Sequence, residues 1–350
     1  MSQTPREVIT RTLRFESPER IGRDIWYLPW AVNNHPQAVA ELRRQFPSDF
    51  GYPVNPFGPS ARARGTLYLA GTSVDSWGVV RVNLQDGIIG EVHEPILPDP
   101  DHVDLEAIKP PYETFPADTD AARDQVNRDC AKSDLFMFAT GHNPQPWEQY
   151  QFLRGTENAM MDVMLHTDTV AKALAIIHEF YLRSLDLWLG TDVDAITMSD
   201  DWGSQDQLLI PPALWRQLFK PLYRDYCELA HAHGKFIFFH SDGHISAVYE
   251  DLVEVGFDAV NSQLFCMDMS EVARKAKGQL TFWGEIDRQH VLNAADPQVA
   301  RDAVRDVARH LYDPAGGIIA QLEFSLGTVP ANVTAVFEEW DRIHEETHKA

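Results

Sequence analysis

The stretch KFIFFHSDGHISAVYEDLVEVGFDAVNSQ, residues 235–263, decides the fold of this chain. It contains a short apolar run (235–240), an amphipathic stretch typical of a helix (245–256) and a second short run (257–263). Short strands that are apolar along nearly their whole length, separated by amphipathic helices, are typical of a parallel sheet covered by helices. The stretch therefore predicts two parallel strands joined by a helix.

The same alternation extends in both directions from this stretch. Further apolar runs, each followed by a helical pattern, occur at 135–140, 194–199, 279–286 and 316–324. Six β-α units are thus expected, and two more strands from the N-terminal third would complete a (β/α)₈ TIM barrel. The rival fold is an open doubly wound sheet, which the lack of a GxGxxG turn after a strand disfavours.

The N-terminal region is irregular and rich in proline and glycine. A short helix is expected at 4–14, one strand at Gly78–Leu84 with its β-branched valines, and another at Arg23–Leu28. We expect a single domain over 1–350, with N-terminal strands and lid loops in 1–130 and regular β-α units in 131–350.

The composition limits the function classes. The chain has 350 residues, with 30 basic and 52 acidic residues and a formal charge of -22. Such a charge disfavours nucleic acid and anionic membranes as partners. Three cysteines without a CxxC pair do not indicate a disulfide framework. The polar N-terminus lacks an apolar signal core, so we expect a cytoplasmic protein.

Polar side chains follow nearly every expected strand. In a barrel, the carboxyl ends of the strands form the active-site face, so these residues are expected to meet at one rim. The residues in question are Thr140, His142, Asp200, Asp201, His240, Asp242, Asn261, Gln263, Glu285, Gln321 and Glu323.

His240 and Asp242 form the sharpest motif of the chain. Alternate residues of an extended segment point to the same side, so this imidazole and carboxylate could share a metal ion or form an acid-base pair. Alternatively, Asp242 caps the helix that begins near Ile245. Asp200 and Asp201 could act in catalysis or cap a turn.

Other residues have both a functional and a structural interpretation. Cys266 could be a soft metal ligand or a half-buried loop residue, and Glu323 is costly to bury without a partner. Trp26 and Trp30 could line an apolar substrate pocket or pack in the core. His142, Gln263 and Glu285 are the further substrate-binding candidates.

Taken in order, three segments resemble the uroporphyrinogen decarboxylase superfamily, which also contains zinc-dependent methyltransferases that work with corrinoid proteins. They are RIGRDIWYLPW (20–30), the segment from DDWGSQDQLLIPP to FDAVNSQ (200–263) and TFWGEIDRQHVL (281–292). The resemblance covers most of the chain and implies a (β/α)₈ barrel with its site at the C-terminal rim. It also suggests a homodimer.

The methyltransferase branch resembles this chain better than the decarboxylases do. Its HxC motif and a later cysteine bind zinc, whereas the matching positions here carry His240, Asp242 and Glu323. The resemblance thus implies a harder metal site of these three residues, with Cys266 as a possible fourth ligand. Zinc in such a site could act as a Lewis acid.

The resulting functional hypothesis is an enzyme that moves a methyl group from a small O- or N-methylated substrate to a corrinoid protein. His240, Asp200 and Asp201 are its expected catalytic residues. The alternative is a decarboxylase or other lyase acting on a small carboxylic acid at the same rim. A third hypothesis, from another class, is a barrel that only binds a ligand.

Overall fold

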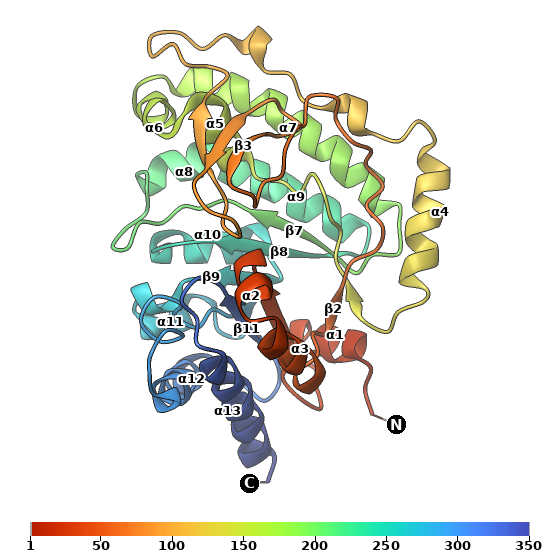
Figure 1. Ribbon diagram of the computed structural model, residues 1–350, viewed down its shortest axis with the longest axis vertical. Helices are drawn as coiled ribbons and strands as arrows, with labels where there is room; N and C mark the ends of the chain where they lie inside the picture. The colour runs from red at the N-terminus through yellow and green to blue at the C-terminus, as the bar shows by residue number, and fades with distance from the viewer. Residues whose placement is uncertain (1, 350) are drawn as a thin grey trace.

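A curved parallel sheet forms the centre of the molecule, whose computed structural model describes residues 2–349 (Figure 1). Its six strands are paired in the order β1-β11-β10-β9-β8-β7. They are β1 (Gly22–Tyr27), β7 (Ala195–Ser199), β8 (Phe236–Ser241), β9 (Ala259–Ser262), β10 (Thr281–Trp283) and β11 (Ile318–Phe324). The alternation of strand and helix from β7 to β11 confirms the α/β pattern predicted from the sequence.

A pair of very short strands lies beside both outer strands of this sheet. β2 (Phe50–Gly51) and β6 (Phe136–Met137) are parallel to each other. The Asp49 amide donates to the Arg23 carbonyl of β1 over 2.9 Å, and the Ala139 amide donates to the Ala195 carbonyl of β7 over 2.9 Å. The pair therefore bridges the two edges of the six-stranded sheet.

The strand expected at Gly78–Leu84 exists but belongs to another sheet. β3 (Gly71–Val74), β4 (Val80–Asn83) and β5 (Glu91–Glu94) form an antiparallel sheet outside the central one. The prediction that the Gly78–Leu84 strand helps to complete the barrel is therefore wrong. From the N-terminal third, only β1 joins the central sheet, and β2 lies beside it. A strand of two residues such as β2 is too short to give a recognisable hydrophobic pattern in the sequence.

Helices cover the outer side of the central sheet (Figure 1). The N-terminal half contains α1 (Pro5–Leu13), α2 (Pro29–Asn34), α3 (Pro36–Gln45), α4 (Thr119–Cys130), α5 (Pro146–Arg154), α6 (Thr156–Leu165) and α7 (Thr167–Leu189). The C-terminal half contains α8 (Pro212–Leu218), α9 (Lys220–Ala232), α10 (Tyr249–Val255), α11 (Met269–Ala276), α12 (Pro297–Leu311) and α13 (Pro330–Lys349). Short 3-10 turns occur at Leu105–Ala107, Tyr112–Thr114, Ser246–Val248 and Leu264–Cys266.

The sequence pattern of α12 explains how such a helix packs. Its buried residues recur at the helical spacing of three and four: Ala300, Ala303, Val304, Val307 and Leu311. This apolar stripe faces the molecule while charged residues face outward. Asp296 begins the helix by accepting the Gln298 amide, as expected of an N-cap.

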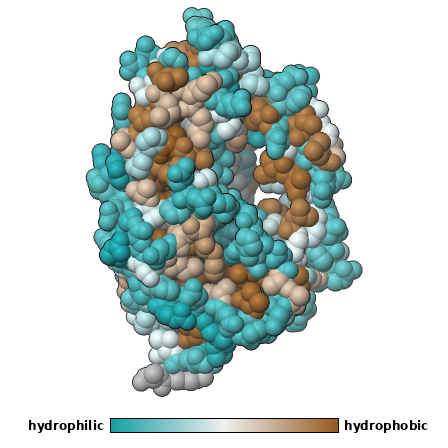
Figure 2. All heavy atoms as spheres, turned by 90° about the vertical axis from the view of Figure 1, so that its left-hand side faces the viewer, coloured by the Kyte–Doolittle hydropathy of each residue, from teal (hydrophilic) through white to brown (hydrophobic). Residues whose placement is uncertain are grey.

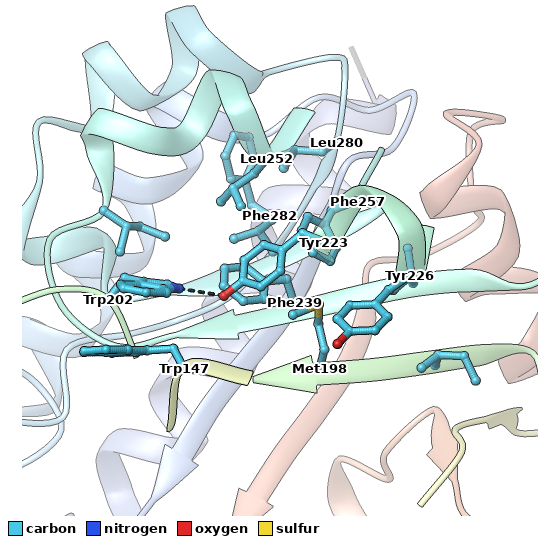
Figure 3. Packing of buried hydrophobic residues seen from close by; sticks show 14 of the residues in the cluster. Trp147, Met198, Trp202, Tyr223, Tyr226, Phe239, Leu252, Phe257, Leu280 and Phe282 are labelled. Atoms are coloured by element: carbon cyan, nitrogen blue, oxygen red, sulfur yellow. Dashed lines mark hydrogen bonds between the residues drawn. The ribbon is translucent and has the colours of Figure 1, made fainter. Parts of the chain in front are cut away.

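Two apolar cores result from this arrangement. The smaller one fills the inside of the curved sheet, mainly with aromatic rings: Phe50, Phe136, Phe138, Phe238 and Trp283. The larger one lies between the sheet and its helices, where Tyr223, Phe239 and Phe257 pack together (Figure 3). The filled interior leaves only the two ends of the strands for a binding site.

The outer surface is mostly hydrophilic on the side shown in Figure 2, where a hollow is bordered by apolar residues. Within the described residues, no helix is both long enough and apolar enough to cross a membrane.

Candidate functional site

The site is centred on His240, near the end of β8. Its Nε2 atom lies 3.6 Å from Asp201 Oδ1 and 3.8 Å from Asp242 Oδ1. The indole ring of Trp26, from β1, meets the imidazole edge-on with a centroid distance of 5.2 Å. The structure thus brings together three of the residues expected at the rim, together with one expected aromatic residue.

Asn261 on β9 fixes the orientation of this imidazole. Its Oδ1 atom lies 2.7 Å from His240 Nδ1. Its amide nitrogen donates to the Trp283 carbonyl and, over 2.9 Å, to Gln321 Oε1. Because both amide hydrogens are used there, Oδ1 must accept from a protonated Nδ1. Nε2 then faces the two carboxylates, and in the neutral form of the ring it presents its lone pair to them.

This arrangement fits a divalent cation. Asp242 Oδ1 is buried and has no hydrogen-bond partner among the described residues. Asp201, Asp242 and His240 each offer one ligand atom, all within 4.8 Å of one another. An imidazole nitrogen with two carboxylate oxygens is a donor set that zinc accepts. Burial raises the pKa of Asp201, against the opposing effect of His240.

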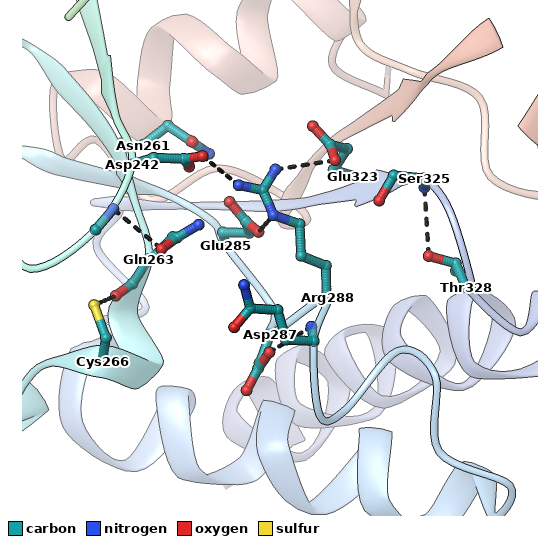
Figure 4. A network of polar contacts seen from close by, with 12 residues as sticks. Asp242, Asn261, Gln263, Cys266, Glu285, Asp287, Arg288, Glu323, Ser325 and Thr328 are labelled. Carbon is teal, nitrogen blue, oxygen red and sulfur yellow. Dashed lines mark hydrogen bonds and ion pairs between the residues drawn. The ribbon is translucent and has the colours of Figure 1, made fainter. Parts of the chain in front are cut away.

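Arg288 organises the neighbouring carboxylates (Figure 4). Its guanidinium contacts Asp242 Oδ2, lies 3.5 Å from Glu285 Oε1 and donates to Glu323 Oε1 over 2.9 Å. Burial raises the pKa of Glu285 to about 8. Glu323 therefore faces Arg288, and the metal-binding group found in residues 2–349 does not include it.

Cys266 lies apart from the His240 group. Its thiol donates to the Gln263 carbonyl over 3.0 Å, and burial raises its pKa to about 11. It lines a small cavity of about 90 Å³ with Gln263, Glu285 and Arg288. The side chain of Gln263 accepts the Gly243 amide over 3.0 Å. With this pKa, Cys266 is a neutral thiol at neutral pH, and it serves here as a hydrogen-bond donor.

A larger cavity of about 650 Å³ opens in front of His240 and Asp201. Glu148, from the first turn of α5, lines it as well. Ser199 Oγ donates to its carboxylate over 3.2 Å, and burial together with Asp201 holds its pKa well above the usual range. Glu148 is therefore a half-buried carboxyl group whose protonated form is favoured by its surroundings.

His142 lines the same cavity from the loop after β6. Its Nε2 atom lies 2.8 Å from Thr114 Oγ1, and its backbone has a φ of 49°. Burial lowers its pKa to about 4, so the ring is neutral. Trp30 lies elsewhere, on α2, where it packs against His35 with a centroid distance of 5.4 Å.

A family model described as uroporphyrinogen decarboxylase (URO-D) matches residues 75–343. The chain belongs to the URO-D family. This is a TIM-barrel family, in agreement with the curved α/β sheet. Among solved structures, a methyltransferase from Methanosarcina mazei is similar, with a TM-score of 0.71 and 13% sequence identity, over 98% of this chain and 100% of that one.

A chitinase from Chromobacterium violaceum aligns over 91% of this chain and 98% of its own, with 10% identity and a TM-score of 0.40. A search of curated proteins finds no match. At 13% identity, the methyltransferase structure shows a likeness of fold alone. What a URO-D family member does must therefore be argued from its site.

Asp200 holds the N-terminus of α5, the helix that carries Glu148. Its carboxylate is fully buried and accepts the Trp147 and Glu148 amides at the N-terminus of α5, over 3.1 and 2.8 Å. It also accepts the Tyr223 hydroxyl over 2.6 Å, while Tyr223 in turn accepts the Trp202 indole (Figure 3). Burial raises the pKa of Asp200 to about 7. Both of its oxygens are thus occupied in holding α5, which carries Glu148.

Asp24 plays a similar supporting part on β1. It accepts the indole hydrogens of Trp26 and Trp283, over 2.9 and 3.1 Å, and the Ser48 hydroxyl over 3.2 Å. Burial raises its pKa to about 6. Asp24 thereby fixes the Trp26 ring that contacts His240.

Proposed function

We propose that this URO-D family member is a methyltransferase that moves a methyl group from a small O- or N-methylated substrate to the cobalt of a corrinoid protein. The observation that carries the proposal is the group of His240, Asp201 and Asp242, which borders the same cavity as Glu148, a carboxyl group with a raised pKa. A cation site next to a proton donor suits the activation of a leaving oxygen or nitrogen.

Asp201, His240 and Asp242 would hold the metal ion, with zinc as the expected ion. When bound, it supplies Lewis-acid chemistry at the heteroatom that carries the methyl group. Asn261 keeps the Nε2 lone pair of His240 directed at this position, and Arg288 fixes Asp242 through its other oxygen. The protein residues thus preorganise the three ligand atoms.

The reaction breaks the bond between the methyl carbon and its oxygen or nitrogen. The reduced cobalt of the corrinoid substrate supplies the electron pair for the new cobalt–carbon bond, and the electrons of the broken bond stay on the heteroatom. Glu148 provides the proton that this heteroatom takes up. A half-buried acid whose pKa lies above its usual range can donate at neutral pH.

The remaining parts of the proposal concern architecture and partners. We propose that β2 and β6 close the central sheet into an eight-stranded (β/α)₈ barrel, and that 1–350 is one domain. The hydrogen bonds from Asp49 and Ala139 to the outer strands support closure. The methyl acceptor would arrive on a separate corrinoid protein, and the enzyme would act as a cytoplasmic homodimer.

The test mixes zinc-loaded protein with cob(I)alamin and a panel of methoxylated and N-methylated compounds. Formation of methylcobalamin is followed by absorbance. We expect activity with at least one compound and a loss of more than 100-fold in His240→Ala. His231→Ala is the matched control, because His231 pairs with Asp258 at the end of α9.

Failure of every compound, or full activity of His240→Ala, would refute methyl transfer. Release of carbon dioxide from a small carboxylic acid without any acceptor would instead support the alternative, a decarboxylase or other lyase. Metal analysis of the same preparations shows whether zinc binds and whether Asp242→Ala loses it.

A further inference from the structure

Arg81 is an arginine without an internal partner. It lies on β4, in the antiparallel sheet outside the barrel core, and lines the same 650 Å³ cavity as His240. Its guanidinium lies over the Phe152 ring, 3.9 Å from the centroid. Throughout residues 2–349, the structure records neither a hydrogen bond nor an ion pair for this guanidinium.

The other arginines near the site are fully paired. Arg288 contacts three carboxylates, and Arg154 donates to Asp162 over 2.7 Å and to backbone carbonyls. Burial lowers the pKa of Arg81, although Asp75 and Glu148 act to raise it. A half-buried guanidinium with unused hydrogens is a ready receptor for a carboxylate, which it can bind with two parallel hydrogen bonds.

We propose that Arg81 binds the carboxylate of the substrate, so that the methyl donor is a small monocarboxylate. One anionic group is expected because Arg81 is the only lysine or arginine among the residues that line this cavity. Binding of a carboxylate by Arg81 does not depend on the proposed function. Only the statement that the bound molecule is also the methyl donor rests on it.

The cavity gives such a molecule two different ends. Arg81 comes from the outer sheet, whereas Asp201 and His240 come from the carboxyl ends of β7 and β8. Asp75 and Glu148 lie near enough to Arg81 to act on its pKa, so the guanidinium must offset them when it binds a carboxylate. The methyl-bearing heteroatom is then free to reach the His240 end.

The lining of the cavity includes aromatic and apolar side chains. Trp77, Phe152 and Tyr181 line the cavity, together with Leu67 and Ile89. Such walls favour a flat apolar body, with a few polar groups fixing its orientation. A methoxybenzoate has this shape and charge distribution, and serves as the probe.

The test is isothermal titration calorimetry without any methyl acceptor. Three carboxylates are titrated (4-methoxybenzoate, benzoate and methoxyacetate), and 4-methoxybenzamide provides the uncharged match to the first. We expect wild type to bind 4-methoxybenzoate at least tenfold more tightly than the amide. Arg81→Gln should remove this preference, and Arg81→Lys should retain part of it.

Arg183→Gln is the matched control, because Arg183 also lies over an aromatic ring, that of Tyr112, but outside this cavity. Urea unfolding of each variant shows that it is folded. The proposal is overturned if wild type binds none of the three carboxylates, or if Arg81→Gln binds 4-methoxybenzoate as tightly as wild type does.

The outcomes separate this inference from the proposed function. Tight, Arg81-dependent binding of carboxylates without any methylcobalamin formation supports the carboxylate site and contradicts methyl transfer. Equal turnover of 4-methoxybenzoate and its amide supports methyl transfer and contradicts the role of Arg81.

Discussion

Replacing Asp24 by asparagine should make the protein more stable at neutral pH. Asp24 is buried beneath Trp26 and Trp283, and its pKa is raised to about 6 from an ordinary 3.8. One pKa unit corresponds to about 1.4 kcal/mol, so ionising Asp24 in the folded protein costs about 3 kcal/mol. Asparagine can still accept both indole hydrogens through Oδ1 and offer its amide to Ser48.

The sign follows from comparing the two states. Well below pH 3.8 the carboxyl is protonated in both the folded and the unfolded protein, so it has no pH effect. Between pH 4 and 6 the unfolded state ionises first, and wild type loses stability as the pH rises. Above pH 6 both states are ionised and the loss is constant. The asparagine variant has no such loss.

Urea unfolding of both proteins at pH 4, 5, 6 and 7 measures this effect. The stability of Asp24→Asn relative to wild type should increase by about 2 kcal/mol from pH 4 to pH 7. A control is Asp129→Asn, because the pKa of Asp129 is lowered by Lys132 and its loss should destabilise at neutral pH. A difference between Asp24→Asn and wild type that stays constant over this range would show that the three donors stabilise the anion fully.

Three further changes test the support of the site. Asn261→Leu should weaken zinc binding by about 10- to 100-fold, because the imidazole loses the acceptor that orients it; competition with a chelator measures this, and an unchanged affinity would contradict the role of Asn261. Arg288→Met should destabilise the fold by about 3–5 kcal/mol, because it leaves carboxylates buried without a cation. In urea unfolding, this variant should lose more stability at pH 9 than at pH 6, since Glu285, with a pKa of about 8, ionises between these pH values. An equal loss of stability at both pH values would show that Glu285 does not titrate in this range. Tyr223→Phe should cost about 1–3 kcal/mol, because the Trp202 indole loses its acceptor and Asp200 loses one of its three donors. A thermal shift measures this cost, and a neutral effect would mean that the two α5 amides satisfy Asp200 without the hydroxyl.

The sequence predicted the central part of the site because that part depends on strand ends. Parallel strands bring their carboxyl ends to one edge, so identifying the β7 and β8 runs was enough to place Asp201 beside His240 and Asp242. The register then follows, since Ser199 pairs with His240 and Ser241 with Ser262.

Residues outside the strands could not be placed in this way. Glu148 reaches the cavity because Asp200 holds the N-terminus of α5. It lies six residues after His142, and no regular spacing relates the two. Arg81 belongs to a sheet that the barrel pattern does not include. Arg288 could have been predicted, because it lies three residues after Glu285. Several carboxylates at one rim require a nearby cation, and this arginine is close to one of them in the sequence.

The carboxylates at the rim provide a further argument for the proposed cation. Buried carboxylates must be neutralised, and the protein does this differently for each one. Glu148 and Glu285 have raised pKa values and can keep a proton. Glu323 and one oxygen of Asp242 are matched by Arg288.

The other oxygen of Asp242, Oδ1, is paired with neither a proton nor an arginine. It is buried, lacks a donor among the described residues, and lies 3.8 Å from His240 Nε2, which in the neutral form of the ring presents a lone pair to it. An acceptor opposite an acceptor is unfavourable unless a positive charge lies between them. A proton on Nε2 would satisfy one carboxylate, whereas a divalent ion would satisfy Asp201, Asp242 and His240 together. The second arrangement uses all three ligand atoms, which is why we place the metal there.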